Sequence, residues 1–173
     1  MAGGTGPARR NMLKMVYVTC WSLDEDESVA LWNLYSTMTH GVAIRSSFRR
    51  LTSALNNSEY PIRAGRVSYI DYAREAITED YLLAAFKYKK RSFRFESEVR
   101  GVAMDIRNGE GTRLPYQGPP GITIPVNIRA LVDRVHVGPL APSWFADVVR
   151  QTIDAFAPDV EVRQSDLAQG PVY

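Results

Sequence analysis

The stretch of residues 95–106 constrains the fold of this chain more than any other. In an extended strand alternate side chains share a face, so Glu96, Glu98 and Arg100 would line up with the apolar residues that follow them. Charge gives way to apolar side chains along one line, which predicts a strand that runs from a polar mouth into a core. Two carboxylates and a guanidinium at such a mouth form either an ion-pair cluster or a site.

Segments of strand type and helix type alternate along the chain, but imperfectly and with short links. Strands are predicted at 16–21, 41–45, 62–72, 95–106, 122–126, 135–137 and 160–162, and helices at 31–38, 48–55, 79–93, around 130–131 and at 142–156. This order favours the α+β class: a single domain with a mixed, mostly antiparallel sheet flanked by helices. We expect that domain to span residues 15–173, after a disordered tail at residues 1–14.

The composition limits the kinds of binding partner and the cellular compartment to be expected for this protein. The net charge of +2 on 173 residues implies no strong attraction to nucleic acid or to a membrane surface. No apolar run has the length of a membrane-spanning helix, and the single cysteine, Cys20, fits a reducing compartment. The sequence therefore predicts a cytoplasmic protein without membrane or nucleic-acid partners.

The sequence contains few residues in patterns typical of a metal site or of a catalytic nucleophile. One cysteine and two histidines, His40 and His136, do not form a ligand-spacing motif, so no metal site is predicted. Cys20 and His136 each fall inside a strand pattern, which is typical of structural side chains. The acidic run Asp24 to Glu27 before Ser28 is typical of a helix N-terminus.

Basic residues gather in the predicted helix at 79–93 and just beyond it. Lys87, Lys90, Arg91 and Arg94 recur at spacings of three and four. Such a stripe either binds phosphate or forms a solvated face near a helix C-terminus.

Glu96 and Glu98 are the strongest chemical candidates. On one face of a strand their charges repel each other unless a cation or a proton lies between them. Arg100, Arg94 and Lys90 are the nearby cations in sequence. The pair is therefore either a salt-bridged network or part of a pocket that stabilises a sugar cation and holds a ribose hydroxyl.

Several motifs together carry a resemblance to a known family. They are Val16-Tyr17-Val18-Thr19-Cys20-Trp21 with Glu27-Ser28, Leu31-Trp32 and Leu34-Tyr35; Gly41 to Arg45 with Gly65 to Tyr72; Lys89 to Phe93 with Glu96 to Arg100; and Val137 to Pro142, Trp144-Phe145 and Gln164 to Leu167. As a set they resemble a bacterial family known as domain of unknown function 2971, over about residues 16–173. That resemblance implies no activity.

Members of that family are longer at the N-terminus. The apolar strand predicted at 16–21 is an open template for pairing. We therefore expect either a homo-oligomer or a missing N-terminal segment that covers this strand.

A second resemblance concerns chemistry. Glu96-Ser97-Glu98, after Arg45-Ser46-Ser47, is similar to the motif order of ADP-ribosyltransferases. It implies an ADP-ribosyl-transfer or NAD-cleaving enzyme of a defence or toxin system, with NAD as cofactor or nucleotide ligand. In that hypothesis Glu98 is the catalytic carboxylate and Glu96 its helper, and the substrate-binding residues are Arg45, Lys90, Arg91, Arg100, Trp32 and Tyr35. The alternative is a non-catalytic interaction domain whose ion-pair cluster is structural.

Overall fold

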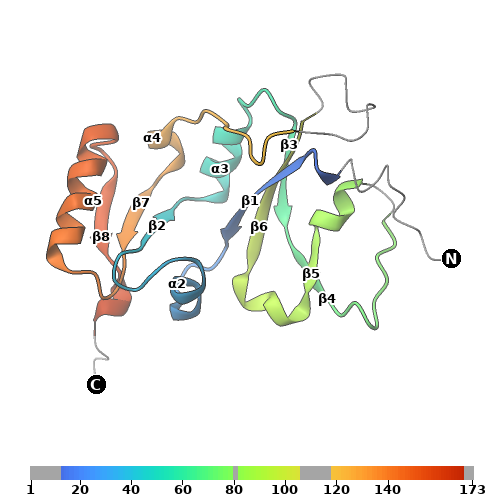
Figure 1. Cartoon of the computed structure of the whole chain (residues 1–173), viewed down its shortest axis with the longest axis horizontal. Coiled ribbons are helices and arrows are strands. Elements are labelled where there is room, and N and C mark those ends of the chain that lie inside the picture. Colours follow the sequence, from blue (N-terminus) through green and yellow to red (C-terminus); the bar gives the residue numbers. More distant parts are fainter. Residues whose placement is uncertain (1–12, 80–81, 106–117, 170–173) are drawn as a thin grey trace. The chain divides into compact units, whose positions relative to one another are not determined.

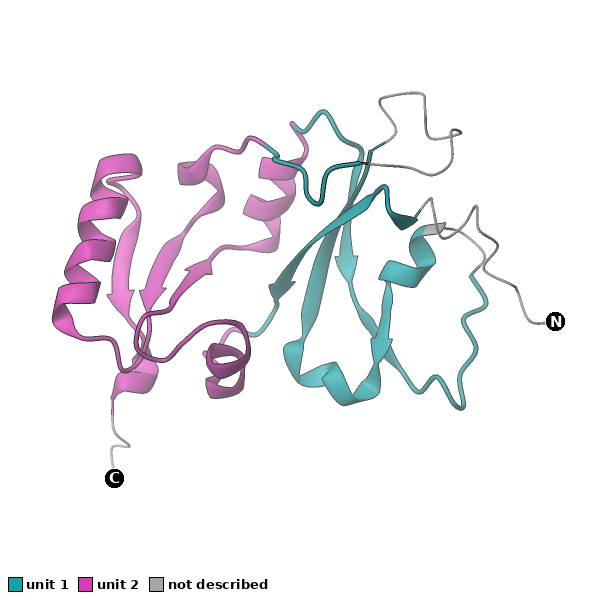
Figure 2. Ribbon diagram, in the orientation of Figure 1, with its two compact units in different colours: residues 1–24, 58–124 teal, residues 25–57, 125–173 magenta. Residues whose placement is uncertain are grey.

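The computed structural model describes residues 13–79, 82–105 and 118–169. The chain divides into two compact units, drawn in different colours in Figure 2. The first unit comprises residues 1–24 and 58–124, and the second comprises residues 25–57 and 125–173. The tail predicted at residues 1–14 lies almost wholly outside the described residues, and a single domain over residues 15–173 stays a prediction.

The first unit is built on a three-stranded sheet with β6 (Glu98–Met104) at its centre (Figure 1). β1 (Val16–Ser22) and β3 (Ile62–Arg66) pair with it on either side, both antiparallel. Beyond its charged first residue, β6 buries Val99, Val102 and Ala103. The predicted strand is confirmed over 98–104, shorter than the predicted 95–106, and on its charged face Glu98 and Arg100 are followed by the buried Val102.

The first unit also holds a short parallel pair, β4 (Ser68–Ile70) and β5 (Tyr88–Lys90). Two 3₁₀ helices flank β5, η1 (Leu82–Phe86) and η2 (Arg91–Glu96). The helix predicted at 79–93 is therefore wrong, and so is one unbroken strand at 62–72. Apolar spacing favoured a helix locally, but β5 forms because its backbone pairs with β4, a tertiary contact that overrides the local pattern.

The second unit has a three-stranded sheet in the order β2-β7-β8. β2 (Val42–Arg45) pairs antiparallel with β7 (Arg134–Val137), and β7 pairs parallel with β8 (Glu161–Gln164). Its helices are α2 (Val29–Tyr35), α3 (Phe48–Leu55), α4 (Ile128–Leu131), α5 (Ser143–Phe156) and the 3₁₀ turn η4 (Asp166–Ala168).

Local capping fixes where several of these helices begin. The Ser47 hydroxyl accepts a hydrogen bond from the Arg50 amide at 3.2 Å, and the Asn127 side chain accepts one from the Ala130 amide at 3.2 Å. Both side chains satisfy amide groups that have no partner inside the helix. The helices predicted at 48–55 and around 130–131 are confirmed.

The core of the second unit lies around β7 and the C-terminal end of α5. Val132, Val135, Ala157 and Val160 are buried together, and side chains of α5 and β8 pack against them. The backbone approaches closely at Gly138, directly after β7, where a Cβ atom would lie 2.5 Å from the Met38 carbonyl oxygen. Glycine is therefore required at this position for steric reasons.

The α+β class and the mostly antiparallel pairing are confirmed. The strands are distributed over three sheets, where the sequence pattern predicted one mixed sheet. The strand expected at 122–126 does not form. Within the described ranges, none of the helices has the length and apolar character needed to cross a membrane.

Candidate functional site

Glu96 and Glu98 approach each other through a turn rather than along one strand. Glu96 is the last residue of η2 and Glu98 the first of β6, so the placement of Glu96 on a strand was wrong. Ser97 between them has a φ of 45° and a ψ of 52°, in the left-handed region. This conformation is uncommon for a residue other than glycine, and here it ends η2 and starts the strand.

A lysine joins the two carboxylates. The Lys89 ammonium contacts Oε2 of Glu96 and lies 3.2 Å from Oε2 of Glu98. Arg100 binds the Glu98 carboxylate through two parallel hydrogen bonds, from Nε to Oε1 at 2.7 Å and from Nη2 to Oε2 at 3.0 Å. We refer to Lys89, Glu96, Glu98 and Arg100 as the carboxylate cluster.

Both carboxylates of the cluster are buried, with Glu96 6% and Glu98 5% exposed. Burial alone raises the pKa of Glu98, but hydrogen bonds from Arg100, Cys20 and Lys89 outweigh it and hold the pKa at about 2. Burial alone lowers the pKa of Lys89, but its bonds to both glutamates outweigh that effect and the pKa is raised. Glu98 is therefore ionised at neutral pH, and Lys89 and Arg100 compensate its charge.

Hydrogen bonds also fix the backbone around the carboxylate cluster. The Glu98 amide donates to the Tyr69 hydroxyl at 2.8 Å, and the Glu98 carbonyl accepts from the Val67 amide at 2.8 Å. Arg100 donates through Nη1 to the Phe86 carbonyl at 2.8 Å. These contacts join β4, β6 and η1 at one place.

Cys20 lies beside the cluster as the register partner of Arg100 across β1 and β6. Burial and, next, a hydrogen bond to Glu98 raise the pKa of its thiol to about 11. A thiol with this pKa is almost entirely protonated at neutral pH and is a poor nucleophile.

A separate hollow of about 500 Å³ opens in the first unit where β4 and β5 end. It is lined by Ile70, Asp71, Tyr72, Ala73, Lys90, Arg91 and Ser92. Two of the predicted substrate-binding residues, Lys90 and Arg91, thus meet at one concave surface. The lining does not include Glu96 or Glu98.

The other three predicted substrate-binding residues belong to the second unit. Trp32 is buried, and its Nε1 donates to Oε2 of Glu27 at 2.9 Å. Tyr35 at the end of α2 is 68% exposed, and Arg45 ends β2 with an exposed side chain. The Trp32 ring is buried in the second unit and is therefore not exposed to a ligand.

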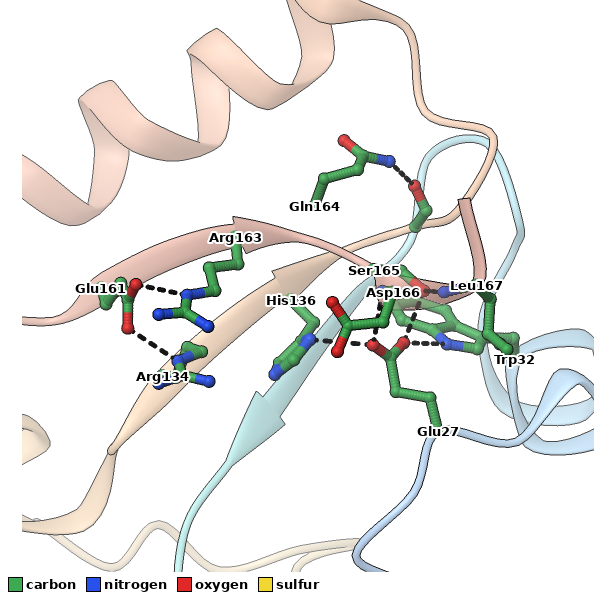
Figure 3. Close-up of polar contacts among 11 residues, drawn as sticks. Glu27, Trp32, Arg134, His136, Glu161, Arg163, Gln164, Ser165, Asp166 and Leu167 are labelled. Atoms are coloured by element: carbon green, nitrogen blue, oxygen red, sulfur yellow. Dashed lines mark hydrogen bonds and ion pairs between the residues drawn. The ribbon is translucent and has the colours of Figure 1, made fainter. Parts of the chain in front are cut away.

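A partly buried carboxylate that the sequence pattern did not reveal, Glu27, is shown among its partners in Figure 3. Its Oε2 accepts from Trp32 and, at 2.6 Å, from the Ser165 hydroxyl. Its Oε1 accepts from the Asp166 amide at 3.0 Å and lies 3.1 Å from Nδ1 of His136. Burial alone raises the pKa of Glu27, but the bonds from Ser165, Asp166 and Trp32 outweigh it and lower the pKa.

α2 begins directly after the acidic run, as predicted, with Ser28 as its N-cap. His136 is 109 residues away from Glu27 in sequence, so no local pattern could have revealed the pair. Ser165 and His136 both bind the Glu27 carboxylate, whereas in a nucleophile-base-acid relay the base binds the nucleophile. Glu27 instead anchors the segment before α2 to β7 and η4.

Across residues 13–79, 82–105 and 118–169, no group of three or more His, Cys, Asp or Glu side chains is arranged to hold a metal ion. In the comparisons with known proteins, no family model, no curated protein and no solved structure matches this chain. The resemblances to domain of unknown function 2971 and to ADP-ribosyltransferases therefore stay predictions.

Proposed function

We propose that this chain is a non-catalytic interaction domain in which the carboxylate cluster has a structural role. The observation that carries this proposal is the pairing of Glu98, which binds Arg100 at 2.7 and 3.0 Å and Lys89 at 3.2 Å while 5% exposed. A carboxylate that stabilises a developing sugar cation has to direct its charge at the substrate. Two cations of the protein already compensate the charge of Glu98.

The cluster has an evident structural task in the first unit. β4 and β5 have three residues each, and so short a pair is not stable by itself. Lys89 of β5 is bound to Glu96 at the end of η2 and to Glu98 at the start of β6. The cluster therefore fastens the short parallel pair to the central strand of the larger sheet.

ADP-ribosyl transfer or NAD cleavage remains the second candidate. It is favoured by Lys90 and Arg91, which directly follow Lys89 and line a hollow within the usual volume range of ligand sites. In this alternative Glu98 would have to exchange part of its pairing with Arg100 for contact with a ribose.

Incubation of the chain with NAD, followed by chromatography for released nicotinamide, tests the proposal. We expect no release above buffer from the wild-type chain or from Glu98→Gln, and a lower urea midpoint for the variant. Release that is lost in Glu98→Gln while the urea midpoint stays unchanged would overturn the structural role. Circular dichroism of both proteins establishes that each is folded in the assay.

A further inference from the structure

We propose that the hollow at the ends of β4 and β5 binds the phosphate of a nucleotide through Lys90 and Arg91. This inference rests on the proposed function, because it names the ligand class of the interaction domain. The hollow's volume, about 500 Å³, lies within the range of small-molecule sites.

The position of the hollow follows from strand direction. β4 and β5 run parallel with Ile70 opposite Lys90, so the two strands end at the same edge. The residues that follow each strand, Asp71 to Ala73 and Arg91 to Ser92, form its walls. In sheets with parallel strands, the space beyond the carboxyl ends is where ligands commonly bind.

Charge is unevenly compensated around this hollow. The Lys90 side chain has neither a hydrogen bond nor an ion pair to any of the described residues and is exposed. Among the described residues the lining holds two cations, Lys90 and Arg91, and one carboxylate, Asp71, which accepts from the Ala73 amide at 3.0 Å and lies 3.6 Å from Nε of Arg74. An anion that enters the hollow therefore meets a cation without a competing partner.

Arg91 uses only part of its hydrogen-bonding capacity within the protein. Its Nη2 donates to Oε1 of Glu75 at 2.5 Å, and the same oxygen accepts from the Asp71 amide at 2.8 Å. This contact uses one of the five N–H donors of the guanidinium and fixes its position at the rim of the hollow. The remaining donors suit the geometry of a phosphate oxygen pair.

The rest of the lining favours a nucleotide over a bare anion. Tyr72 is 48% exposed and supplies an aromatic side chain, and Ser92 supplies a hydroxyl group. An aromatic ring beside a phosphate-binding cation suits a ligand that has both a planar base and a phosphate.

Calorimetric titration of the full chain with ADP, adenosine and inorganic phosphate tests this inference. We expect ADP to bind, adenosine and phosphate to bind at least about tenfold more weakly, and Lys90→Gln to weaken ADP binding about ten- to a hundredfold. Arg63→Gln is the matched control, since it removes one exposed positive charge from the same unit outside the lining and should leave ADP affinity within about twofold.

Three outcomes would overturn the inference: no heat with ADP, equal affinity for adenosine and ADP, or equal affinity of the wild-type chain and Lys90→Gln. Inorganic phosphate that binds as tightly as ADP would overturn the assignment to a nucleotide. ADP has no nicotinamide–ribose bond, so its binding reports on the hollow alone. Failure here is therefore distinct from failure of the proposed function, which nicotinamide release reports.

Discussion

Arg100 holds the carboxylate of Glu98, two positions earlier on the same strand, through two parallel hydrogen bonds of 2.7 and 3.0 Å. Side chains two apart on a strand share a face, and the planar guanidinium matches the two oxygens of a carboxylate. Lys89 then binds the same carboxylate from β5. An interaction between near neighbours in sequence thus becomes the junction of two sheets within the first unit.

Replacement of Glu98 by glutamine should destabilise the protein. The amide keeps the shape of the side chain but removes the negative charge between Lys89 and Arg100, so both partly buried cations lose an ion-pair partner. We expect a loss of about 1–3 kcal/mol in the free energy of unfolding, measured by urea denaturation. Asp147→Asn, which breaks an exposed pair with Arg150, should cost less than about 1 kcal/mol. Equal stability of the two variants would contradict a structural cluster.

Stability should fall on acidification. The folded-state pKa of Glu98 is about 2, against an ordinary value of 4.5, so the unfolded chain takes up this proton first as the pH falls. The contribution is fully present above about pH 5 and is lost towards pH 2, and amounts to about 3 kcal/mol. Urea midpoints measured between pH 7 and pH 3 should decline less steeply in Glu98→Gln than in the wild-type chain. Parallel declines would show that Glu98 does not carry this dependence.

Cys20 should react slowly. A rise of its pKa from 9.0 to about 11 leaves roughly a hundredfold less thiolate at pH 8, and greater intrinsic nucleophilicity recovers only part of that. We expect the reaction with a disulfide reagent such as 5,5′-dithiobis(2-nitrobenzoate) to be about tenfold slower than that of a free thiol of pKa 9. The reaction should be faster in Glu98→Gln, since Glu98 contributes to the shift. A wild-type rate equal to that of the free thiol would contradict the raised pKa.

Replacement of Glu27 should lower the free energy of unfolding more than replacement of its acidic neighbours. Glutamine at this position turns an N–H₂ group towards donors that now bind a carboxylate oxygen, among them Trp32 and Ser165. We expect Glu27→Gln to lower the free energy of unfolding by about 1–3 kcal/mol. Glu25→Gln, at an exposed position two residues earlier, should change it by less than about 0.5 kcal/mol. If both variants unfold at the same urea concentration, Glu27 is not an anchor.

Two glycines form a matched pair for a packing test. Alanine at Gly138 would place a Cβ atom 2.5 Å from the Met38 carbonyl oxygen, whereas at Gly65 nothing lies within 4 Å of that atom. Gly138→Ala should therefore cost about 1–3 kcal/mol through backbone displacement. Gly65→Ala should be neutral or stabilise by up to about 1 kcal/mol, because it restricts the unfolded chain. Thermal unfolding of both variants measures the difference. If Gly138→Ala melts at the same temperature as Gly65→Ala or at a higher one, the packing argument is contradicted.

The local parts of the fold could be predicted from the sequence. Ser47 and Asn127 cap helices through contacts three residues away, and such contacts are visible in any short window. The helix predicted at 79–93 failed because β5 depends on β4, which lies about twenty residues earlier. Apolar periodicity alone cannot distinguish these two outcomes for a short segment.

In the candidate site too, contacts between near neighbours in sequence were predictable and long-range contacts were not. Of the nearby cations that the sequence offers to Glu96 and Glu98, Arg100 is a partner of Glu98, and Lys89 supplies the other contacts. Lys89 was not in the basic stripe, because the stripe assumed helical spacing, while β5 places Lys89 and Lys90 on opposite faces. Glu27 and His136 could not be paired in advance, since only the tertiary fold joins them.

The division of each compact unit into two stretches of chain has a consequence for synthesis on the ribosome. β1 reaches its partner only after Met104 has emerged, and β2 only after residues 134–137. Until then β1 and β2, which are rich in β-branched residues, have no hydrogen-bonding partner in their own sheets. Such unpaired strands favour chaperone binding or mispairing. Any fragment cut at residue 24, 57 or 124 also contains an incomplete copy of at least one unit. Separate expression of either unit would thus require two stretches of chain to be joined by a designed connection.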